Sequence, residues 1–252
     1  MIGNKKVVCI IPARLKSTRF PRKLLSMLQD KPLLQWVWES ASKVSIFDEI
    51  AFAVDAQETA DLVESFGGRA FMTKESCANG TERLVELMQN GLIEADIWVN
   101  WQGDEPFICE EMIRDLLQSC DTEESDVWTL KKRIVKAEEV TSPHFAKVVC
   151  DHRGFALYFS RSQIPYYRDI TDESKKEFYK HVGLYAFTPD ALRKISTLQL
   201  CEIENAEQLE QLRFLYCNLR VRVHETQYEV FGIDLPEHLA RAEAHVKQNC
   251  LV

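Results

Sequence analysis

The feature that most constrains the fold is the alternation, in the first half of the chain, of short apolar runs with segments of helical periodicity. The spacing predicts strands over Val7–Ala13, Ile50–Val54, Arg69–Met72 and Asp96–Trp101, and helices over Leu33–Ser42, Gln57–Phe66 and Thr81–Met88. Successive β-α-β units form a parallel sheet with helices on both faces. Because ligands of such sheets bind beyond the carboxyl ends of the strands, we expect the functional site at that edge.

The second half of the chain has more strands and fewer helices. Its pattern predicts strands over Val127–Ile134, Ala146–Cys150, Ala156–Ser160, Val182–Phe187, Val221–Val223 and Tyr228–Ile233. A hairpin turn is expected at Asp151–Gly154, one helix over Glu204–Tyr216 and a final helix from Pro236. The segment Ile170–Glu177 is charged and lacks an aliphatic pattern, which predicts a mobile loop.

Charge and composition exclude several classes of protein. The formal net charge of -8 argues against a nucleic-acid binder, which needs a basic surface to neutralise phosphates. The apolar run Val7–Ile11 is too short to span a bilayer, and no signal peptide is evident, so we expect a cytoplasmic protein without a membrane partner. The eight cysteines form no Cys-x-x-Cys pair, so neither disulfides nor a zinc site are expected.

A basic segment follows the first predicted strand. Five cations fall within the ten residues from Arg14 to Lys23 of an otherwise acidic chain. Free backbone N–H groups at a helix start favour anions, and Arg and Lys side chains match phosphate oxygens. The segment therefore predicts a triphosphate site, with a solvated basic loop as the alternative. Neither the Walker pattern nor Gly-x-Gly-x-x-Gly occurs in the chain.

Two aspartates are candidate metal ligands. Asp104 lies in Gly-Asp-Glu-Pro after an apolar strand, and Asp234 lies between a predicted strand and the helix from Pro236. Hard oxygen ligands of this kind hold Mg²⁺. The alternatives are a turn in which Asp104 bonds its own backbone and a helix cap at Asp234. Asn79 and Glu82 have the spacing of a capping box, for which a structural role is the default.

Taken together, these segments resemble the CMP-Kdo synthetases, also called 3-deoxy-manno-octulosonate (Kdo) cytidylyltransferases. The matching segments follow the family's order: Ile10–Pro21, Gly67–Thr73, Gly80–Arg83, Val99–Pro106, Ala156–Pro165, His181–Tyr185, Leu209–Arg213 and Gly232–Leu239. The resemblance implies an α/β, Rossmann-like nucleotidyltransferase fold of glycosyltransferase-A type, with a mostly parallel sheet and a smaller β-rich insertion for dimerisation and sugar binding. It implies one domain over residues 1–252, with residues 1–125 mainly binding nucleotide and residues 126–252 mainly binding sugar and forming the dimer.

The resemblance also implies an activity: a magnesium-dependent homodimer transfers CMP from CTP to Kdo, with release of pyrophosphate, for lipopolysaccharide synthesis. Asp104 and Asp234 would hold the metal, and Arg14 and Lys23 would join them in catalysis. The residues implied at the CTP site are Pro12, Ala13, Arg14, Ser17, Arg19, Lys23, Asp55, Asn79, Gly80, Thr81, Arg83 and Gln102. Those implied at the Kdo site are Gln102, Arg161, His181, Tyr185, Glu210 and Gln211.

The chain departs from the family pattern at a few positions. Arg22-Lys23-Leu24 replaces Gly-Lys-Pro, so the basic segment loses a glycine and gains a charge, and Val54 replaces a threonine. Alternative functions are a sialic-acid activating cytidylyltransferase, a nucleotidyltransferase for another base, and a dimer that binds nucleotides without turnover. His181, Tyr185 and Leu209–Arg213 favour the Kdo enzymes by resemblance.

Overall fold

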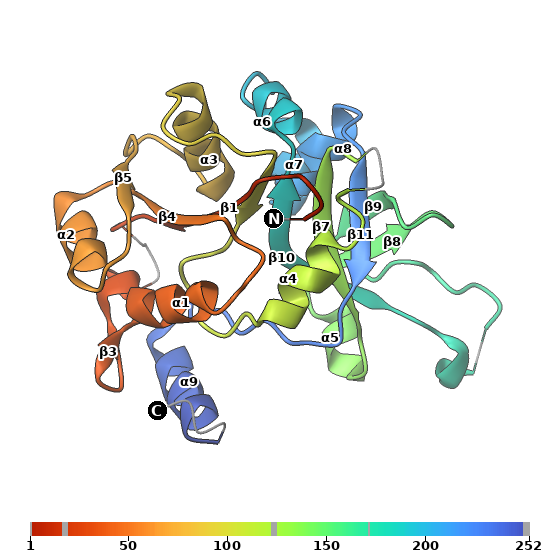
Figure 1. Ribbon diagram of the computed structural model, residues 1–252. Helices are drawn as coiled ribbons and strands as arrows, with labels where there is room; N and C mark the ends of the chain where they lie inside the picture. The colour runs from red at the N-terminus through yellow and green to blue at the C-terminus, as the bar shows by residue number, and fades with distance from the viewer. Residues whose placement is uncertain (1, 17–19, 122–124, 171, 249–252) are drawn as a thin grey trace. The chain divides into compact units, whose positions relative to one another are not determined.

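The computed structural model describes residues 2–16, 20–121, 125–170 and 172–248 (Figure 1). The chain divides into two compact units. The first comprises Met1–Ile113 with Val230–Val252, and the second comprises Arg114–Glu229.

A parallel sheet forms the centre of the first unit. Its strands are β1 (Val7–Ala13), β4 (Glu49–Val54), β5 (Ala70–Met72) and β6 (Ile97–Asn100), in the order β6-β1-β4-β5. The helices between them are α1 (Leu33–Ser42), α2 (Gln57–Ser65) and α3 (Gly80–Gln89). Helix α2 packs against β4 and β5, and α3 packs against β1, β4 and β6. The predicted parallel sheet is confirmed, although β6 ends earlier than expected.

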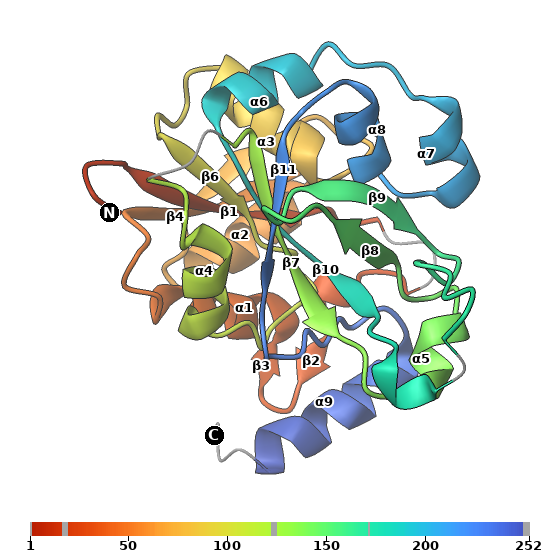
Figure 2. The same cartoon turned by 90° about the vertical axis from the view of Figure 1, so that its right-hand side faces the viewer.

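The rest of the first unit surrounds this sheet. It contains the short helix η1 (Lys23–Leu25), the hairpin of β2 (Met27–Leu28) and β3 (Lys31–Pro32), and α9 (Pro236–Gln248). Helix α9 packs against β2, as Figure 2 shows. Helix α4 (Glu110–Leu117) carries the chain into the second unit.

The strand predicted over Tyr228–Ile233 is wrong, because this segment forms no strand. Ile233 is buried, the Phe231 ring stacks 6.2 Å from that of Phe107, and Tyr228 is exposed. The segment is fixed where the Ile233 N–H donates to the Asp104 carbonyl oxygen at 2.9 Å. Asp234 therefore follows an irregular segment and not a strand end.

The second unit is built on a mixed sheet (Figure 2). Its strands are β7 (Val127–Arg133), β8 (Lys147–Cys150), β9 (Ala156–Ser160), β10 (Tyr179–Phe187) and β11 (Val221–Glu225). Strand β7 pairs antiparallel with β10 and parallel with β11, and β8 pairs antiparallel with β9 and β10. The hairpin turn predicted between β8 and β9 is confirmed: the Gly154 N–H donates to the Asp151 carbonyl oxygen at 3.0 Å, with Gly154 at φ 85°.

Short helices complete the second unit. They are α5 (Ala137–Thr141), η2 (Glu173–Lys175), α6 (Pro189–Ile195), α7 (Glu202–Glu207) and α8 (Gln211–Tyr216). The single helix predicted over Glu204–Tyr216 is wrong, because Gln208 takes a left-handed conformation with φ 54° and ends α7. The segment Ile170–Glu177 contains η2, and its mobility stays a prediction.

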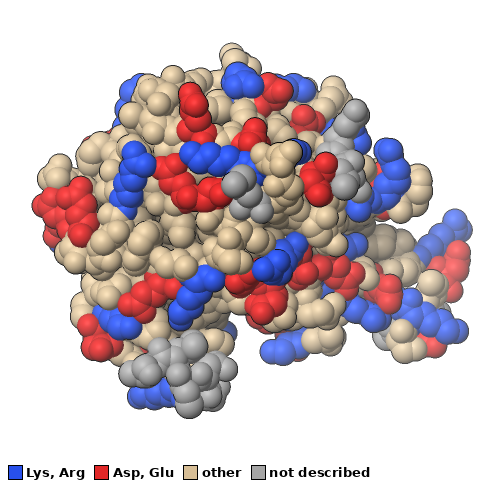
Figure 3. Space-filling view, viewed as in Figure 1, with Lys and Arg blue, Asp and Glu red and all other residues tan. Residues whose placement is uncertain are grey.

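Three further properties bear on the class of protein. No helix in the described ranges is both long and apolar enough to cross a membrane. The seven cysteines that the structure describes are free thiols, as expected. On the described surface of the face in Figure 3, Lys and Arg side chains are interspersed with Asp and Glu and do not form an extended basic stripe.

Candidate functional site

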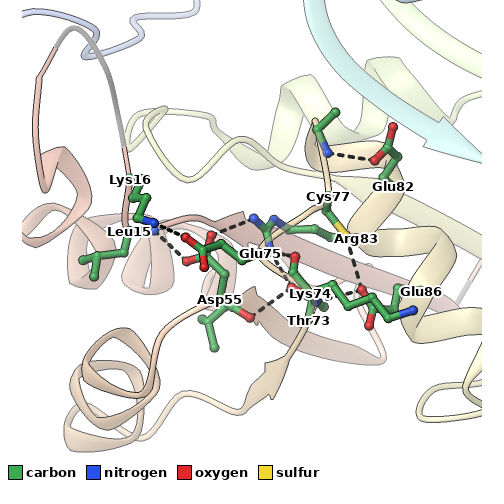
Figure 4. Close-up of polar contacts among 12 residues, drawn as sticks. Leu15, Lys16, Asp55, Thr73, Lys74, Glu75, Cys77, Glu82, Arg83 and Glu86 are labelled. Atoms are coloured by element: carbon green, nitrogen blue, oxygen red, sulfur yellow. Dashed lines mark hydrogen bonds and ion pairs between the residues drawn. The ribbon is translucent and has the colours of Figure 1, made fainter. Parts of the chain in front are cut away.

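A buried ion pair ties together the carboxyl ends of three parallel strands (Figure 4). Asp55, after β4, accepts hydrogen bonds from the Leu15 N–H after β1 and from the Arg83 guanidinium of α3, both at 2.8 Å. The other side of that guanidinium donates to the Thr73 hydroxyl, after β5, at 2.5 Å. Arg83 is only 2% exposed. The sequence implied that Asp55 and Arg83 contact the nucleotide, and the structure places both in this internal network.

The network fixes the start of the basic segment. Arg14 follows β1 directly and is exposed, and Lys16 forms an ion pair with Glu75. Ser17 and Arg19, both implied at the CTP site, lie outside the described residues. Arg22 pairs with Glu58 and takes the left-handed conformation, with φ 57°, that the family's glycine would favour. Arginine therefore stands here in a backbone conformation that glycine adopts without strain.

The start of helix α3 lies close to the ends of β1 and β6. Asn79 caps the helix by accepting from the Glu82 N–H at 2.9 Å, and Glu82 accepts in turn from the Ala78 N–H at 2.7 Å. A side-chain carbon added at Gly80 would lie 3.0 Å from the Pro12 ring. The capping role predicted for Asn79 is therefore present, and glycine allows the helix start to approach the strand end.

Side chains around this helix start differ in their access to a ligand. Thr81 is almost fully buried, as is Ala13 at the end of β1. Asn100, which ends β6, is 1% exposed, and its Oδ1 atom has no hydrogen-bond partner among the described residues. Asn100 was not predicted as a site residue from the sequence; its position at the end of an apolar strand was the available signal. Gln102 lies in the loop that follows and is half-buried.

An acidic pair surrounds one lysine at the same edge of the sheet. The Lys23 ammonium donates to Asp104 Oδ2 at 2.5 Å and to Asp234 Oδ1 at 3.0 Å. The side chains of Lys23, Asp104 and Asp234 are 11%, 26% and 40% exposed. The structure thus brings together two carboxylates that are 130 residues apart in sequence, Asp104 and Asp234, beside a cation of the basic segment.

Glu105 adds a third carboxyl group, which was not predicted as a site residue from the sequence. Its Oε2 atom is buried and has no hydrogen-bond partner among the described residues. Burial, and then the charges of Asp104 and Asp234, raise the pKa of Glu105 well above its ordinary value. Its place in Gly-Asp-Glu-Pro, next to Asp104, was the signal that could have identified it.

These groups fit a divalent cation of the hard type. In the part of the chain that the structure describes, no group of three or more His, Cys, Asp or Glu side chains forms a complete metal cage. Mg²⁺ does not require one, because it binds through one or two carboxylates and takes its other ligands from water and substrate phosphates. Asp104 and Asp234 provide such a partial donor set.

In the second unit, two of the implied sugar-binding residues, Tyr185 and Gln211, contact His181. Its Nε2 atom lies 2.9 Å from the Thr129 hydroxyl, and its Nδ1 atom lies 3.4 Å from the Gln211 amide nitrogen. The rings of Phe159 and Tyr185 lie 4.9 Å and 5.4 Å from the imidazole. Burial lowers the pKa of His181 to about 3, so the ring is neutral at physiological pH.

The other residues implied at the sugar site differ in their surroundings. Glu210 lies directly before α8, and its carboxylate accepts from Arg213 at 3.4 Å. Arg161 donates to the backbone carbonyl oxygens of Glu207, Pro143 and Gln208, at 2.7, 2.9 and 3.3 Å. The structure therefore groups Glu210 and Gln211 at the start of α8, whereas the Arg161 guanidinium binds the end of α7.

Comparison with known proteins identifies relatives over nearly the whole chain. The family model described as "Cytidylyltransferase" matches residues 8–221. The chain is 44% identical to the 3-deoxy-manno-octulosonate cytidylyltransferase of Thermodesulfovibrio yellowstonii, over 94% of this chain and 96% of the relative. It is 42% identical to the protein of the same name from Porphyromonas gingivalis, over 97% and 98% of the two chains.

Solved structures show the same relationship. A CMP:2-keto-3-deoxy-manno-octonic acid synthetase complexed with CTP superposes with a TM-score of 0.90 at 40% identity, covering 97% of this chain and 99% of that one. A cytidylyltransferase from Leptospira borgpetersenii has a TM-score of 0.63 at 15% identity, over 96% and 87% of the two chains, and shares the fold. The comparison confirms the fold class and the family expected from the sequence.

Proposed function

The chain belongs to the cytidylyltransferase family, and from this premise we propose that it transfers CMP from CTP to Kdo and releases pyrophosphate. The names of its full-length relatives, and a CTP complex among its structural neighbours, support these substrates. The observation in this structure that supports the chemistry is the contact of Lys23 with both Asp104 and Asp234. This contact joins the lysine that we propose to bind phosphate and the two carboxylates that we propose to bind metal.

The first task of such an enzyme is to reduce the repulsion between two anionic substrates. Unit charges about 4 Å apart repel by roughly 1 kcal/mol in water and roughly 4 kcal/mol at an intermediate effective dielectric. We propose that Arg14 and Lys23 bind the triphosphate and draw charge toward the leaving pyrophosphate. The anomeric hydroxyl of Kdo then attacks the α-phosphorus in line. The work of these side chains is positioning and electrostatic stabilisation.

Asp104 and Asp234 are the proposed ligands of Mg²⁺. When bound, Mg²⁺ would polarise the α-phosphate and acidify the attacking hydroxyl, so that the chain needs no dedicated general base. The Lys23 ammonium donates to both carboxylates, and we propose that the same ammonium binds the triphosphate of CTP.

The proposed sugar contacts are Gln102, His181, Tyr185, Glu210 and Gln211. We assign Arg161 a supporting role, because its guanidinium binds three backbone carbonyl oxygens. We also propose that the protein is a cytoplasmic homodimer, and light scattering on the purified protein would measure its mass.

The proposed function is tested by measuring pyrophosphate release from a panel of substrates. CTP, UTP and GTP are each combined with Kdo, a sialic acid or no sugar, with Mg²⁺ and with a chelator. We expect release only from CTP with Kdo and Mg²⁺. Preference for sialic acid would show a different cytidylyltransferase, preference for UTP or GTP a different nucleotide specificity, and CTP binding without release a non-catalytic protein; each would refute the proposal.

A further inference from the structure

The strand that carries His181 is interrupted next to it. The antiparallel ladder between β7 and β10 shifts register between Val182 and Tyr185. At this bulge the carbonyl oxygens of Val182 and Leu184 both lie within hydrogen-bonding distance of the Thr129 hydroxyl, at 3.1 and 2.9 Å. Thr129 is fully buried on β7. Its hydroxyl therefore has two carbonyl acceptors and, as its third neighbour, His181 Nε2 at 2.9 Å.

The chemistry of a hydroxyl group decides how these contacts are shared. A threonine hydroxyl has one proton to donate and two lone pairs that can accept. A carbonyl oxygen can only accept, so the Thr129 proton is directed to Val182 or Leu184. His181 Nε2 must then carry the proton of its own contact with Thr129. The other ring nitrogen, Nδ1, keeps its lone pair.

The surroundings of Nδ1 agree with this assignment. Its neighbour is the Gln211 amide nitrogen, which is a donor, at the long distance of 3.4 Å. Gln211 is 3% exposed and lies at the start of α8. Aromatic rings of Phe159 and Tyr185 flank the imidazole, and no carboxylate contributes to the shift of its pKa. A neutral ring with an acceptor at Nδ1 satisfies every contact that the structure gives it.

We propose that Thr129 is a positioning residue that holds His181 as the neutral Nε2–H tautomer, so that Nδ1 accepts from a hydroxyl group of the sugar, in place of the long 3.4 Å contact with the Gln211 amide, and does not bind the sugar carboxylate. An Nδ1 lone pair accepts from a hydroxyl, whereas an anionic carboxylate has nothing to donate to it. This proposal rests on the proposed transfer to Kdo for the identity of the ligand. The assignment of the tautomer does not depend on it.

The tautomer is measured directly by a long-range ¹H–¹⁵N correlation spectrum of the full-length protein with labelled histidines. The His181 signals are assigned by their absence in His181→Gln. We expect Nε2 to be protonated and Nδ1 to be unprotonated in the wild type and in Thr129→Ser, and an Nδ1–H population to appear in Thr129→Val. A wild-type ring protonated at Nδ1, or at both nitrogens at pH 7, would overturn the proposal.

The consequence for the sugar is measured by steady-state kinetics on the same variants. Loss of one correctly oriented hydrogen bond should raise the KM for Kdo in Thr129→Val about 3- to 10-fold, with the KM for CTP unchanged. Thr129→Ser should restore the wild-type value. Thr59→Val, which removes a buried hydroxyl without a hydrogen-bond partner among the described residues, is the matched control. A Thr129→Val variant with the wild-type KM for Kdo, or with both KM values raised equally, would contradict the proposal.

Two further results keep this proposal separate from the proposed function. If the wild-type protein does not turn over Kdo, the proposed function fails while the tautomer spectrum still tests the role of Thr129. If Thr129→Val does not fold, as judged by circular dichroism, the role of Thr129 is tested by the wild-type spectrum and by the kinetics of Thr129→Ser. Thr129→Ser must then keep both the tautomer and the KM for Kdo.

Discussion

Arg22 carries a backbone strain that glycine would avoid. It takes φ 57° immediately before Lys23, which contacts both aspartates of the site. A left-handed conformation costs an L-residue roughly 1–2 kcal/mol, and glycine adopts it freely. The Arg22 ion pair with Glu58 is exposed and offsets little of this cost.

In helices an alanine variant is usually more stable than the glycine variant, and we expect the opposite order of stability at position 22. Arg22→Gly should be more stable than Arg22→Ala by about 1 kcal/mol, because both variants lose the ion pair and only alanine keeps the backbone strain. Urea unfolding of the two variants measures the difference. The same comparison at the buried helical residue Ala41, as wild type and Ala41→Gly, provides a control in which alanine is the more stable. An Arg22→Ala variant as stable as Arg22→Gly would show that the turn is not strained.

At the scale of elements, the Asp55–Arg83 pair joins three strand ends and helix α3. Asp55 follows β4, Leu15 follows β1, and Thr73 follows β5. Both charged side chains are almost completely buried. Removing one partner of a buried ion pair leaves an uncompensated charge in the protein interior.

Arg83→Met should therefore lower the free energy of unfolding by about 3–5 kcal/mol. Arg83→Met combined with Asp55→Asn should recover part of that loss, because the orphaned carboxylate is gone. Denaturant unfolding of both variants measures this coupling. Equal losses in the single and double variants would mean that the pair contributes packing and not charge compensation.

The elements themselves show which features a sequence can predict. Strand β1, helix α1 and strand β9 have the predicted bounds, because apolar runs or apolar periodicity mark them in the sequence. The expected helix over Glu204–Tyr216 is divided at Gln208, which takes the left-handed conformation. The periodicity of apolar residues does not report the backbone conformation of a single residue, so the sequence did not predict this division. The expected strand at Tyr228–Ile233 is absent, because apolar alternation reports burial and not the hydrogen bonds that define a strand.

For the molecule as a whole, the sequence predicted which kinds of charged residue form the site, but it did not predict which of them contact one another. The basic segment and the acids Asp104 and Asp234 were visible as motifs. Their meeting around Lys23 depends on long-range packing, as does the use of Asp55 in an internal ion pair. Thr129 was not identified, because an isolated threonine within a strand has no distinctive pattern.

Buried histidines make the stability of the protein depend on pH. The Nε2 atom of His224 lies 2.8 Å from the Ser119 hydroxyl. Burial, and then the charge of Arg222, lower the pKa of His224 to about 4. The unfolded chain binds this proton near its ordinary pKa of about 6.5. The stability that neutral His224 contributes is therefore full above pH 6.5 and is lost as the pH falls toward 4.

The advantage of the wild type over His224→Gln should shrink as the solution is acidified. Between pH 6.5 and 4.5 we expect the difference in unfolding free energy to fall by at most about 1.4 kcal/mol per pH unit. Urea unfolding at pH 7.5, 5.5 and 4.5 measures it, and other titrating groups, including His181, cancel because both proteins contain them. A difference that stays constant over this range would show that His224 is not held neutral by the fold.

The central claim is that the carboxylates around Lys23 form the site of cytidylyl transfer. Its most direct test is pyrophosphate release from CTP and Kdo by Asp104→Asn, compared with the exposed control Asp190→Asn. Because the variant keeps the shape of the side chain and loses its charge, we expect normal circular dichroism and a loss of about 100-fold or more in kcat, the scale of a lost electrostatic contact in a transition state. The control should retain the wild-type rate. A near wild-type rate for Asp104→Asn would contradict the claim.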